Sequence, residues 1–170
     1  MNVGTERHAV LLSIVELLAP GIEEVRERLK EALEDADWDE YSPTDALIDA
    51  LYDAEAFYDN SSGLAYFDWK ANPQELRDDL QQLPTCPREL AWDWYDWTES
   101  TKWDPDDLDD FLWPLAERCN ELGVAIVSVF VDGDGFTLGF LPVTRLDELR
   151  KQSAAVGAQI DIIRPGEPTV

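Results

Sequence analysis

The chain has 170 residues, of which 37 are Asp or Glu and 13 are Lys or Arg, so its formal charge is −24. This charge repels nucleic acid and anionic membranes and attracts basic partners. An apolar content of 45%, with 11% aromatic residues, argues against a disordered acidic chain. No apolar stretch reaches the length that spans a bilayer.

The N-terminal part of the chain predicts three helices. Apolar residues recur at helical spacing over residues 5–18 and 21–33, with Pro20 and Gly21 between the two stretches. The sequence Ser42-Pro43-Thr44-Asp45 is typical of a capped helix start, and we expect this third helix to run to Phe57.

The middle of the chain predicts a strand, a helix, an aromatic segment and another helix. Residues 64–70 alternate as a strand does, which places Leu64, Tyr66 and Asp68 on one face. A helix is expected over residues 72–83, followed by a strand or an ordered aromatic loop over 90–97. Asp104 and Pro105 begin a helix that Gly123 ends.

The clearest pattern is a β-hairpin near the C-terminus. Residues 124–131 and 136–141 are apolar and rich in β-branched residues, and the sequence Asp132-Gly133-Asp134-Gly135 separates them. A helix over 143–156 and a strand over 159–163 follow. The prediction is one α+β domain over 1–170, with helices packed around a small, mainly antiparallel sheet. Residues 1–35 form a partly independent helical hairpin in this prediction, and 164–170 a frayed tail.

Several segments resemble an uncharacterised, acidic bacterial family known as a domain of unknown function. They are residues 63–70 (GLAYFDWK), 90–95 (LAWDWY), 123–127 (GVAIV), 132–134 (DGD) and 138–142 (LGFLP). The resemblance covers the chain from about Leu47 onward and implies no catalytic activity and no site residues. Because members of such families are found as immunity partners of bacterial toxins, the resemblance favours an immunity function.

The acids gather in two stretches. No Lys or Arg occurs from Glu31 to Trp69, and a second acidic stretch, residues 89–110, contains four Trp. Most of these rings would ordinarily pack in a core or lid, but Trp and Tyr are also frequent anchors of interfaces. We predict ten partner-binding residues: Asp37, Asp39, Glu40, Asp45, Asp49, Asp53, Trp92, Trp94, Asp96 and Trp97.

Catalytic patterns are weak in this sequence. His8 is the only histidine, and we interpret it as a surface or capping residue. Asp132 and Asp134 resemble an Asp-x-Asp phosphotransfer motif, but a second strand follows at once, which favours a turn. The Asp residues after Trp103 do not match a calcium-binding loop and are typical of a helix start, with Asp104 as the cap. We predict no metal, no cofactor and no enzyme activity.

The leading functional hypothesis is an acidic cytoplasmic immunity or inhibitor protein that neutralises a bacterial toxin by occluding its basic active site. The alternatives are a DNA mimic that inhibits a DNA-binding protein, an Asp- and Mg²⁺-dependent hydrolase, and a regulatory adaptor. The expected partner is a basic protein, and neither nucleic acid nor membrane. Cys86 and Cys119 are too few for a disulfide framework, and both are expected to be reduced, with Cys119 on the inner face of a helix.

Overall fold

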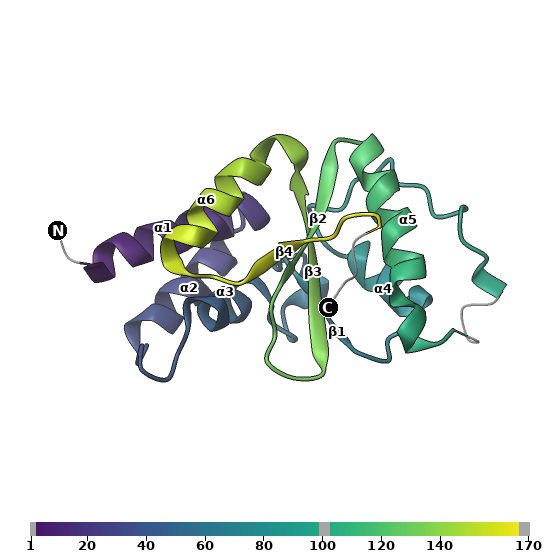
Figure 1. Ribbon diagram of the computed structural model, residues 1–170. Helices are drawn as coiled ribbons and strands as arrows, with labels where there is room; N and C mark the ends of the chain where they lie inside the picture. Colours follow the sequence, from purple (N-terminus) through teal and green to yellow (C-terminus); the bar gives the residue numbers. More distant parts are fainter. Residues whose placement is uncertain (1–2, 99–102, 167–170) are drawn as a thin grey trace.

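The computed structural model describes residues 3–98 and 103–166 of the chain (Figure 1). The described residues form helices α1 (Val3–Leu18), α2 (Glu23–Glu34), α3 (Pro43–Leu51), α4 (Pro73–Leu80), α5 (Leu108–Glu121) and α6 (Leu146–Val156). The strands are β1 (Ala65–Asp68), β2 (Val124–Val129), β3 (Gly135–Pro142) and β4 (Ile160–Ile162). Short 3-10 helices lie at η1 (Phe57–Asp59), η3 (Pro105–Asp107) and η4 (Val143–Arg145).

The four strands form one antiparallel sheet in the order β1-β3-β2-β4. The predicted hairpin pairs β2 with β3, and Ala125 lies opposite Leu141. β1 and β4 are the two edge strands. The predicted α+β class, with helices around a small antiparallel sheet, is confirmed.

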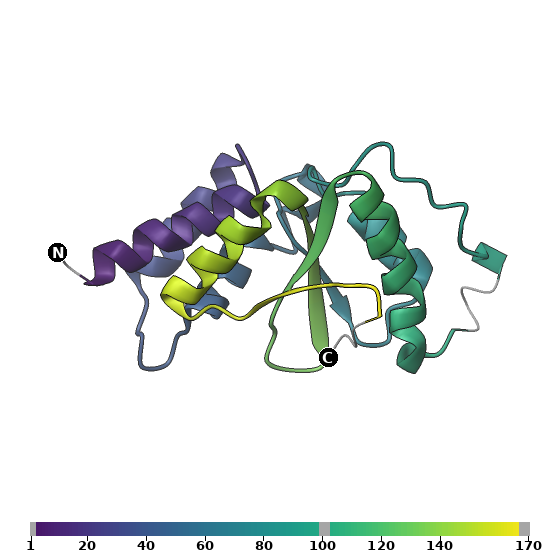
Figure 2. The same cartoon turned by 45° about the horizontal axis from the view of Figure 1, so that its top comes forward.

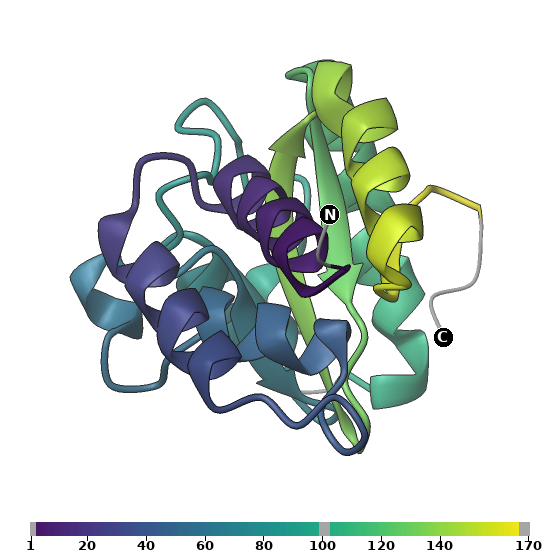
Figure 3. The ribbon, with the colours of Figure 1, turned by 90° about the vertical axis from the view of Figure 1, so that its left-hand side faces the viewer.

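The sheet is the middle of three layers. α1, α2, α3 and α6 cover one face, and α4 and α5 cover the other (Figures 1 and 3). Consecutive strand residues therefore enter different cores: Val127 and Leu141 pack in the cluster on the α1 side, whereas Ile126 and Phe140 pack in the cluster on the α5 side. Strands covered on both faces need apolar residues at every position, which explains the unbroken apolar runs in the sequence.

The hairpin turn is the loop predicted at residues 132–135. Gly133 has a φ of 139°, a conformation that L side chains rarely adopt. The buried hydroxyl of Thr137 accepts a hydrogen bond from the Val129 amide at 2.9 Å and donates one to the Val129 carbonyl at 2.7 Å. Thr137 thus ties β3 to the end of β2 just before the chain turns.

The third helix begins as predicted and ends earlier than predicted. Ser42 and Asp45 form a reciprocal capping box around the first turn. The prediction that the helix continues to Phe57 is wrong, because Tyr52 is extended and the Asp53 carboxylate accepts hydrogen bonds from the amides of Glu55 and Ala56. These local bonds stabilise a turn in place of two more helical turns.

Other boundaries shift by a few residues. The fourth helix ends at Leu80 and not at residue 83, and residues 90–97 form a loop and not a strand. Asp104 is a cap, as expected, but it caps the short helix η3, and α5 begins at Leu108.

Arg28 of α2 connects three parts of the chain. Its guanidinium donates hydrogen bonds to the carbonyls of Ala50 and Ser61. Burial lowers the pKa of Arg28. This side chain therefore joins α2 to the end of α3 and to the turn before β1.

The two helices of the predicted N-terminal hairpin share a hydrophobic cluster with the sheet. Leu11 and Leu18 of α1 and Leu29 of α2 are buried in the cluster that includes Val127. The partial independence of this hairpin stays a prediction. The tail predicted as frayed, 164–170, lies partly outside the described residues.

Candidate partner-binding surfaces

The acidic loop, defined as residues 35–42 between α2 and α3, has an ordered aromatic base. The rings of Trp38 and Tyr41 stack with their centroids 6.1 Å apart, and the Arg7 guanidinium lies 4.5 Å from the centroid of the Trp38 ring. The Tyr41 amide donates to the Asp37 carbonyl. These contacts connect the loop to α1 and stabilise its turn.

Four of the six predicted acids in this part of the chain stabilise local structure. Asp37 accepts from the Asp39 amide, Asp45 completes the capping box, and Asp53 holds the turn after α3. Asp49 accepts a 2.6 Å hydrogen bond from the Tyr41 hydroxyl, and burial together with that bond raises the pKa of Tyr41. Asp39 and Glu40 are exposed, and among the described residues neither carboxylate has a hydrogen bond or ion pair.

The Trp segment, defined as residues 92–97, packs on α5. The Phe111 ring is buried beneath Trp94, Tyr95 and Trp97, with centroid distances of 5.3, 5.2 and 6.2 Å. Trp92, Trp94 and Trp97 are all half-buried. The rings act mainly as a lid over the cluster on the α5 side, as the plainer interpretation of the sequence expected.

Several polar groups of the Trp segment are bonded within the chain. The indole N–H groups of Trp94 and Trp97 donate to the carbonyls of Ala91 and Trp92 at 2.9 and 2.7 Å. The Arg77 guanidinium lies 4.1 Å from the Trp97 ring centroid. Hydrogen bonds from Thr98 lower the pKa of Asp96, which is exposed.

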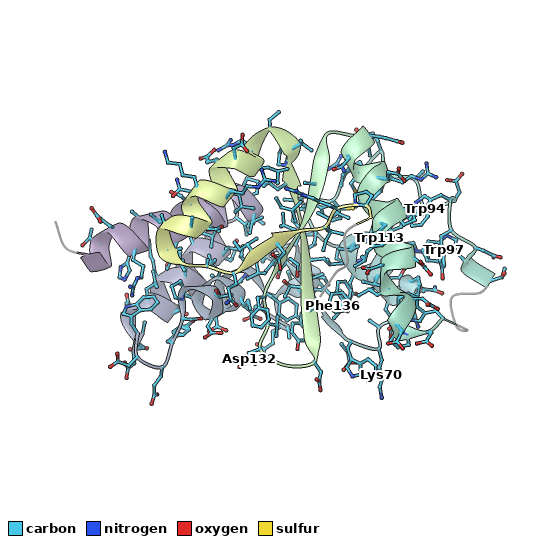
Figure 4. The ribbon with its side chains drawn as sticks, in the orientation of Figure 1. Lys70, Trp94, Trp97, Trp113, Asp132 and Phe136 are labelled. Carbon is cyan, nitrogen blue, oxygen red and sulfur yellow. The ribbon has the colours of Figure 1, made fainter. Side chains whose placement is uncertain are left out.

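The structure does not bring the two predicted groups together. The acidic loop lies at one end of the molecule, beside α2, and the labelled Trp94 and Trp97 lie at the other end, beyond α5 (Figures 1, 2 and 4). The sheet separates them. A single surface that contains all ten predicted residues is therefore absent from this fold, and the binding function of each group stays a prediction.

A third surface, which sequence reasoning missed, lies at the outer edge of β1. A pocket of about 450 Å³ is formed there, and we call it the tyrosine pocket. Residues from both faces of β1 line it, together with η1 and α4: Tyr58, Tyr66, Phe67, Asp68, Ala71, Glu75, Asp78, Asp79 and Gln82. Tyr58 and Tyr66 are 67% and 39% exposed, so their rings form an accessible wall.

The aromatic wall of the tyrosine pocket is held in place from behind. Tyr66 stacks on Tyr52 with centroids 5.8 Å apart, and Tyr58 meets Phe57 edge to face at 5.1 Å. A Cβ atom on Gly135 would collide with the Tyr66 hydroxyl and Cζ. Glycine at this position therefore lets the Tyr66 ring lie against β3.

The carboxylates of the tyrosine pocket are not equivalent. Asp68 accepts from the Lys70 amide, Glu75 completes the capping box of α4, and Asp78 pairs with Arg77. Asp79 is half-buried, and no described residue gives its carboxylate a hydrogen bond or ion pair. Burial, with smaller effects of Asp78 and Glu75, raises the pKa of Asp79.

The remaining catalytic and metal candidates lie apart from these surfaces. His8 is exposed on α1, and Asp132 lies in the hairpin loop (Figure 4). Residues 3–98 and 103–166 contain no group of three or more His, Cys, Asp or Glu side chains arranged to hold a metal ion. Both cysteines are free thiols, and burial raises the pKa of Cys86 to about 11 and that of Cys119 to about 12.

Comparison with known proteins identifies the family. The family model described as a domain of unknown function, DUF6630, matches residues 10–163. The chain belongs to this family. The DUF6630 match begins well before Leu47, so it includes most of α1 and all of α2 as well as the sheet. No curated protein and no solved structure matches the chain. Among the helices of the described residues, none has the length and apolar character needed to cross a membrane.

Proposed function

We propose that this DUF6630 protein binds a basic protein, and that it acts in the bacterial cytoplasm as an immunity or inhibitor protein that occludes the basic active site of a toxin. The observation that carries the proposal is the acidic loop, in which Asp39 and Glu40 are exposed and neither carboxylate forms an ion pair with a described cation. The chain as a whole is also acidic, with a formal charge of −24.

The distribution of the cations strengthens the electrostatic argument. Several of the few basic side chains lie in local pairs, such as Arg26 with Glu16, Arg145 with Glu148 and Arg150 with Asp147. These pairs neutralise acids on α1 and α6, whereas no described ion pair neutralises a carboxylate of the acidic loop, where Arg7 lies on the Trp38 ring. An uncompensated field attracts a positively charged partner and accelerates association.

The experiment has two steps. The tagged protein is used at low salt to capture its partner from a lysate of the source organism, and the product of the neighbouring gene is tested directly. The association rate constant of the purified pair is then measured by stopped-flow at increasing NaCl. We expect a fall of about tenfold or more between low and physiological salt, because salt screens electrostatic steering.

Matched variants distinguish the acidic loop from general acidity. Asp39→Asn with Glu40→Gln removes two charges from the loop, and Asp132→Asn with Asp134→Asn removes two charges from the exposed hairpin loop. We expect the first pair to slow association more than the second. An association rate that does not change with salt would contradict the proposal.

A further inference from the structure

The tyrosine pocket is a second acidic feature with a different chemistry from the acidic loop. It is concave, it has two exposed phenol rings, and it contains a half-buried carboxylate with no partner among the described residues. Unpaired charges are costly to bury, and a cationic ligand would offset the cost at Asp79.

The rings and carboxylates of the tyrosine pocket favour a planar cation as the ligand. Tyr rings attract cations through their faces, and a guanidinium both stacks on aromatic rings and bonds carboxylates in a forked geometry. The chain itself shows this affinity, since Arg7 and Arg77 lie over Trp38 and Trp97 at 4.5 and 4.1 Å. The tyrosine pocket offers the same aromatic rings and carboxylates, but no Arg is among its lining residues.

The pocket is formed before any ligand arrives. Tyr52 supports the Tyr66 ring from one side, and Gly135 leaves room for its hydroxyl. The capping box of Asn72 and Glu75 fixes the first turn of α4, which carries Asp78 and Asp79 one turn later. A preformed site loses little conformational entropy on binding.

The position of the pocket suits a protein ligand. β1 is an edge strand, so the side of the strand that faces away from β3 is not paired with another described strand. A partner segment that lies along this edge would place an arginine side chain between the phenol rings and α4. The surrounding acids, Asp68, Glu75 and Asp78, complement the charge of a basic protein.

We propose that the tyrosine pocket binds the guanidinium of an arginine side chain on the basic protein partner, with Tyr58 and Tyr66 as stacking surfaces and Asp79 as the principal carboxylate. The inference rests on the proposed function for the basic character of the partner. The acidic loop attracts the partner over a long range, whereas the tyrosine pocket at the edge of β1 would bind one specific arginine of that partner.

The test uses the full chain and two short peptides as probes. Acetyl-Gly-Arg-Gly-amide and acetyl-Gly-Lys-Gly-amide are titrated into ¹⁵N-labelled protein, and amide shifts are followed by NMR. We expect saturable shifts in β1, η1 and α4 with the arginine peptide and weaker binding of the lysine peptide. Shifts spread over all acidic surfaces, or equal binding of the lysine peptide, would overturn the assignment.

Three variants make the test specific. Asp79→Asn and Tyr66→Leu should each weaken arginine-peptide binding by about tenfold, the size expected from a lost charge-assisted bond or a lost cation–π contact. Asp161→Asn removes an exposed acid from β4, the opposite edge strand, and should leave the affinity unchanged. A loss with Asp161→Asn equal to that with Asp79→Asn would show general charge attraction only.

The outcomes separate this inference from the proposed function. In one outcome, a basic partner binds with strong salt dependence, and Asp79→Asn and Tyr66→Leu bind it with the affinity of the unchanged protein. In that case the inference fails and the proposed function stands. If the arginine peptide occupies the pocket but no basic protein binds, the pocket assignment stands and the proposed function fails.

Discussion

The Trp segment and the tyrosine pocket are both aromatic, both acidic and both in contact with the hydrophobic cluster on the α5 side of the sheet, yet their polar groups differ. In the Trp segment the indole N–H groups of Trp94 and Trp97 are bonded to nearby carbonyls, and an arginine covers the Trp97 ring. In the tyrosine pocket the hydroxyls of Tyr58 and Tyr66 and the Asp79 carboxylate form no hydrogen bond or ion pair with a described residue.

The difference shows that aromatic and acidic content does not by itself locate a binding surface. A half-buried ring whose polar group is already bonded, and whose face is already covered, contributes mainly to stability. A ring that is supported from behind and open in front is available to a partner. The Trp segment therefore contributes to the stability of the fold and its binding function stays a prediction, while the tyrosine pocket is the better candidate for recognition.

The largest predicted effect concerns Phe111, which lies beneath the Trp segment. Phe111→Ala should lower the free energy of unfolding by about 3–5 kcal/mol, because it removes a fully buried ring and the support of three other rings. Denaturant unfolding followed by Trp fluorescence measures the change. A loss below about 1 kcal/mol, on the scale of a surface substitution, would mean that the Trp segment is not a structural lid.

The next effect concerns Gly135, which supports the tyrosine pocket. Gly135→Ala should displace the Tyr66 ring and lower the free energy of unfolding by about 1–3 kcal/mol, the usual cost of overpacking. The arginine peptide should no longer bind measurably. Gly133→Ala, in the hairpin loop, is the comparison variant for stability, since space around Gly133 is open and only its positive φ opposes the change. Retention of full peptide affinity in Gly135→Ala would contradict the geometry of the pocket.

A smaller effect, which is an increase in the free energy of unfolding, concerns Asp79. Its pKa is raised above the ordinary value, so the folded state holds the proton more tightly than the unfolded state, and stability falls as the pH rises through the range between the two pKa values. Asp79→Asn removes this cost and should raise the free energy of unfolding at pH 7 by about 0.2–1 kcal/mol. A variant that becomes less stable would show that the carboxylate is structurally required.

The smallest effect is the pH dependence of arginine-peptide binding. The acids facing Asp79 are Asp78 and Glu75 on α4, with Asp68 on β1 across the pocket. The phenols of Tyr58 and Tyr66 line the same pocket, and burial raises the pKa of the nearby Tyr52 phenol. Affinity should fall as the pH drops through the raised pKa of Asp79, because the carboxylate loses its charge. Asp79→Asn should flatten this part of the profile, and an unchanged profile would contradict the assignment.

The sequence was most informative where one local requirement dominates. The almost unbroken apolar runs at 124–131 and 136–141 suit strands buried on both faces, and they predicted the strands 124–129 and 135–142 within a residue or two. Ser42 and Asp45 predicted the start of α3, but its end depends on Asp53, whose carboxylate bonds outcompete the helical preference of Ala54 and Ala56.

The candidate site was predictable only in part. Strand alternation placed Tyr66 on a face with Asp68, and that acid was a usable signal for an exposed ring, although Leu64, predicted on the same face, is fully buried. The pocket also needs Tyr58 from η1, Asp79 from α4 and a glycine on β3, and only tertiary packing brings these elements together. The density of Trp drew attention to a segment in which the indole N–H groups of Trp94 and Trp97 are bonded within the chain.

The most direct measurement compares Tyr66→Leu with Trp97→Leu, each assayed for both free energy of unfolding and arginine-peptide affinity. We predict opposite outcomes: Tyr66→Leu loses about tenfold in affinity with a stability change below about 1 kcal/mol, and Trp97→Leu keeps the affinity and loses about 2 kcal/mol or more of stability. A Trp97→Leu variant that loses peptide affinity as strongly as Tyr66→Leu, while remaining stable, would contradict the assignment of the tyrosine pocket as the binding site.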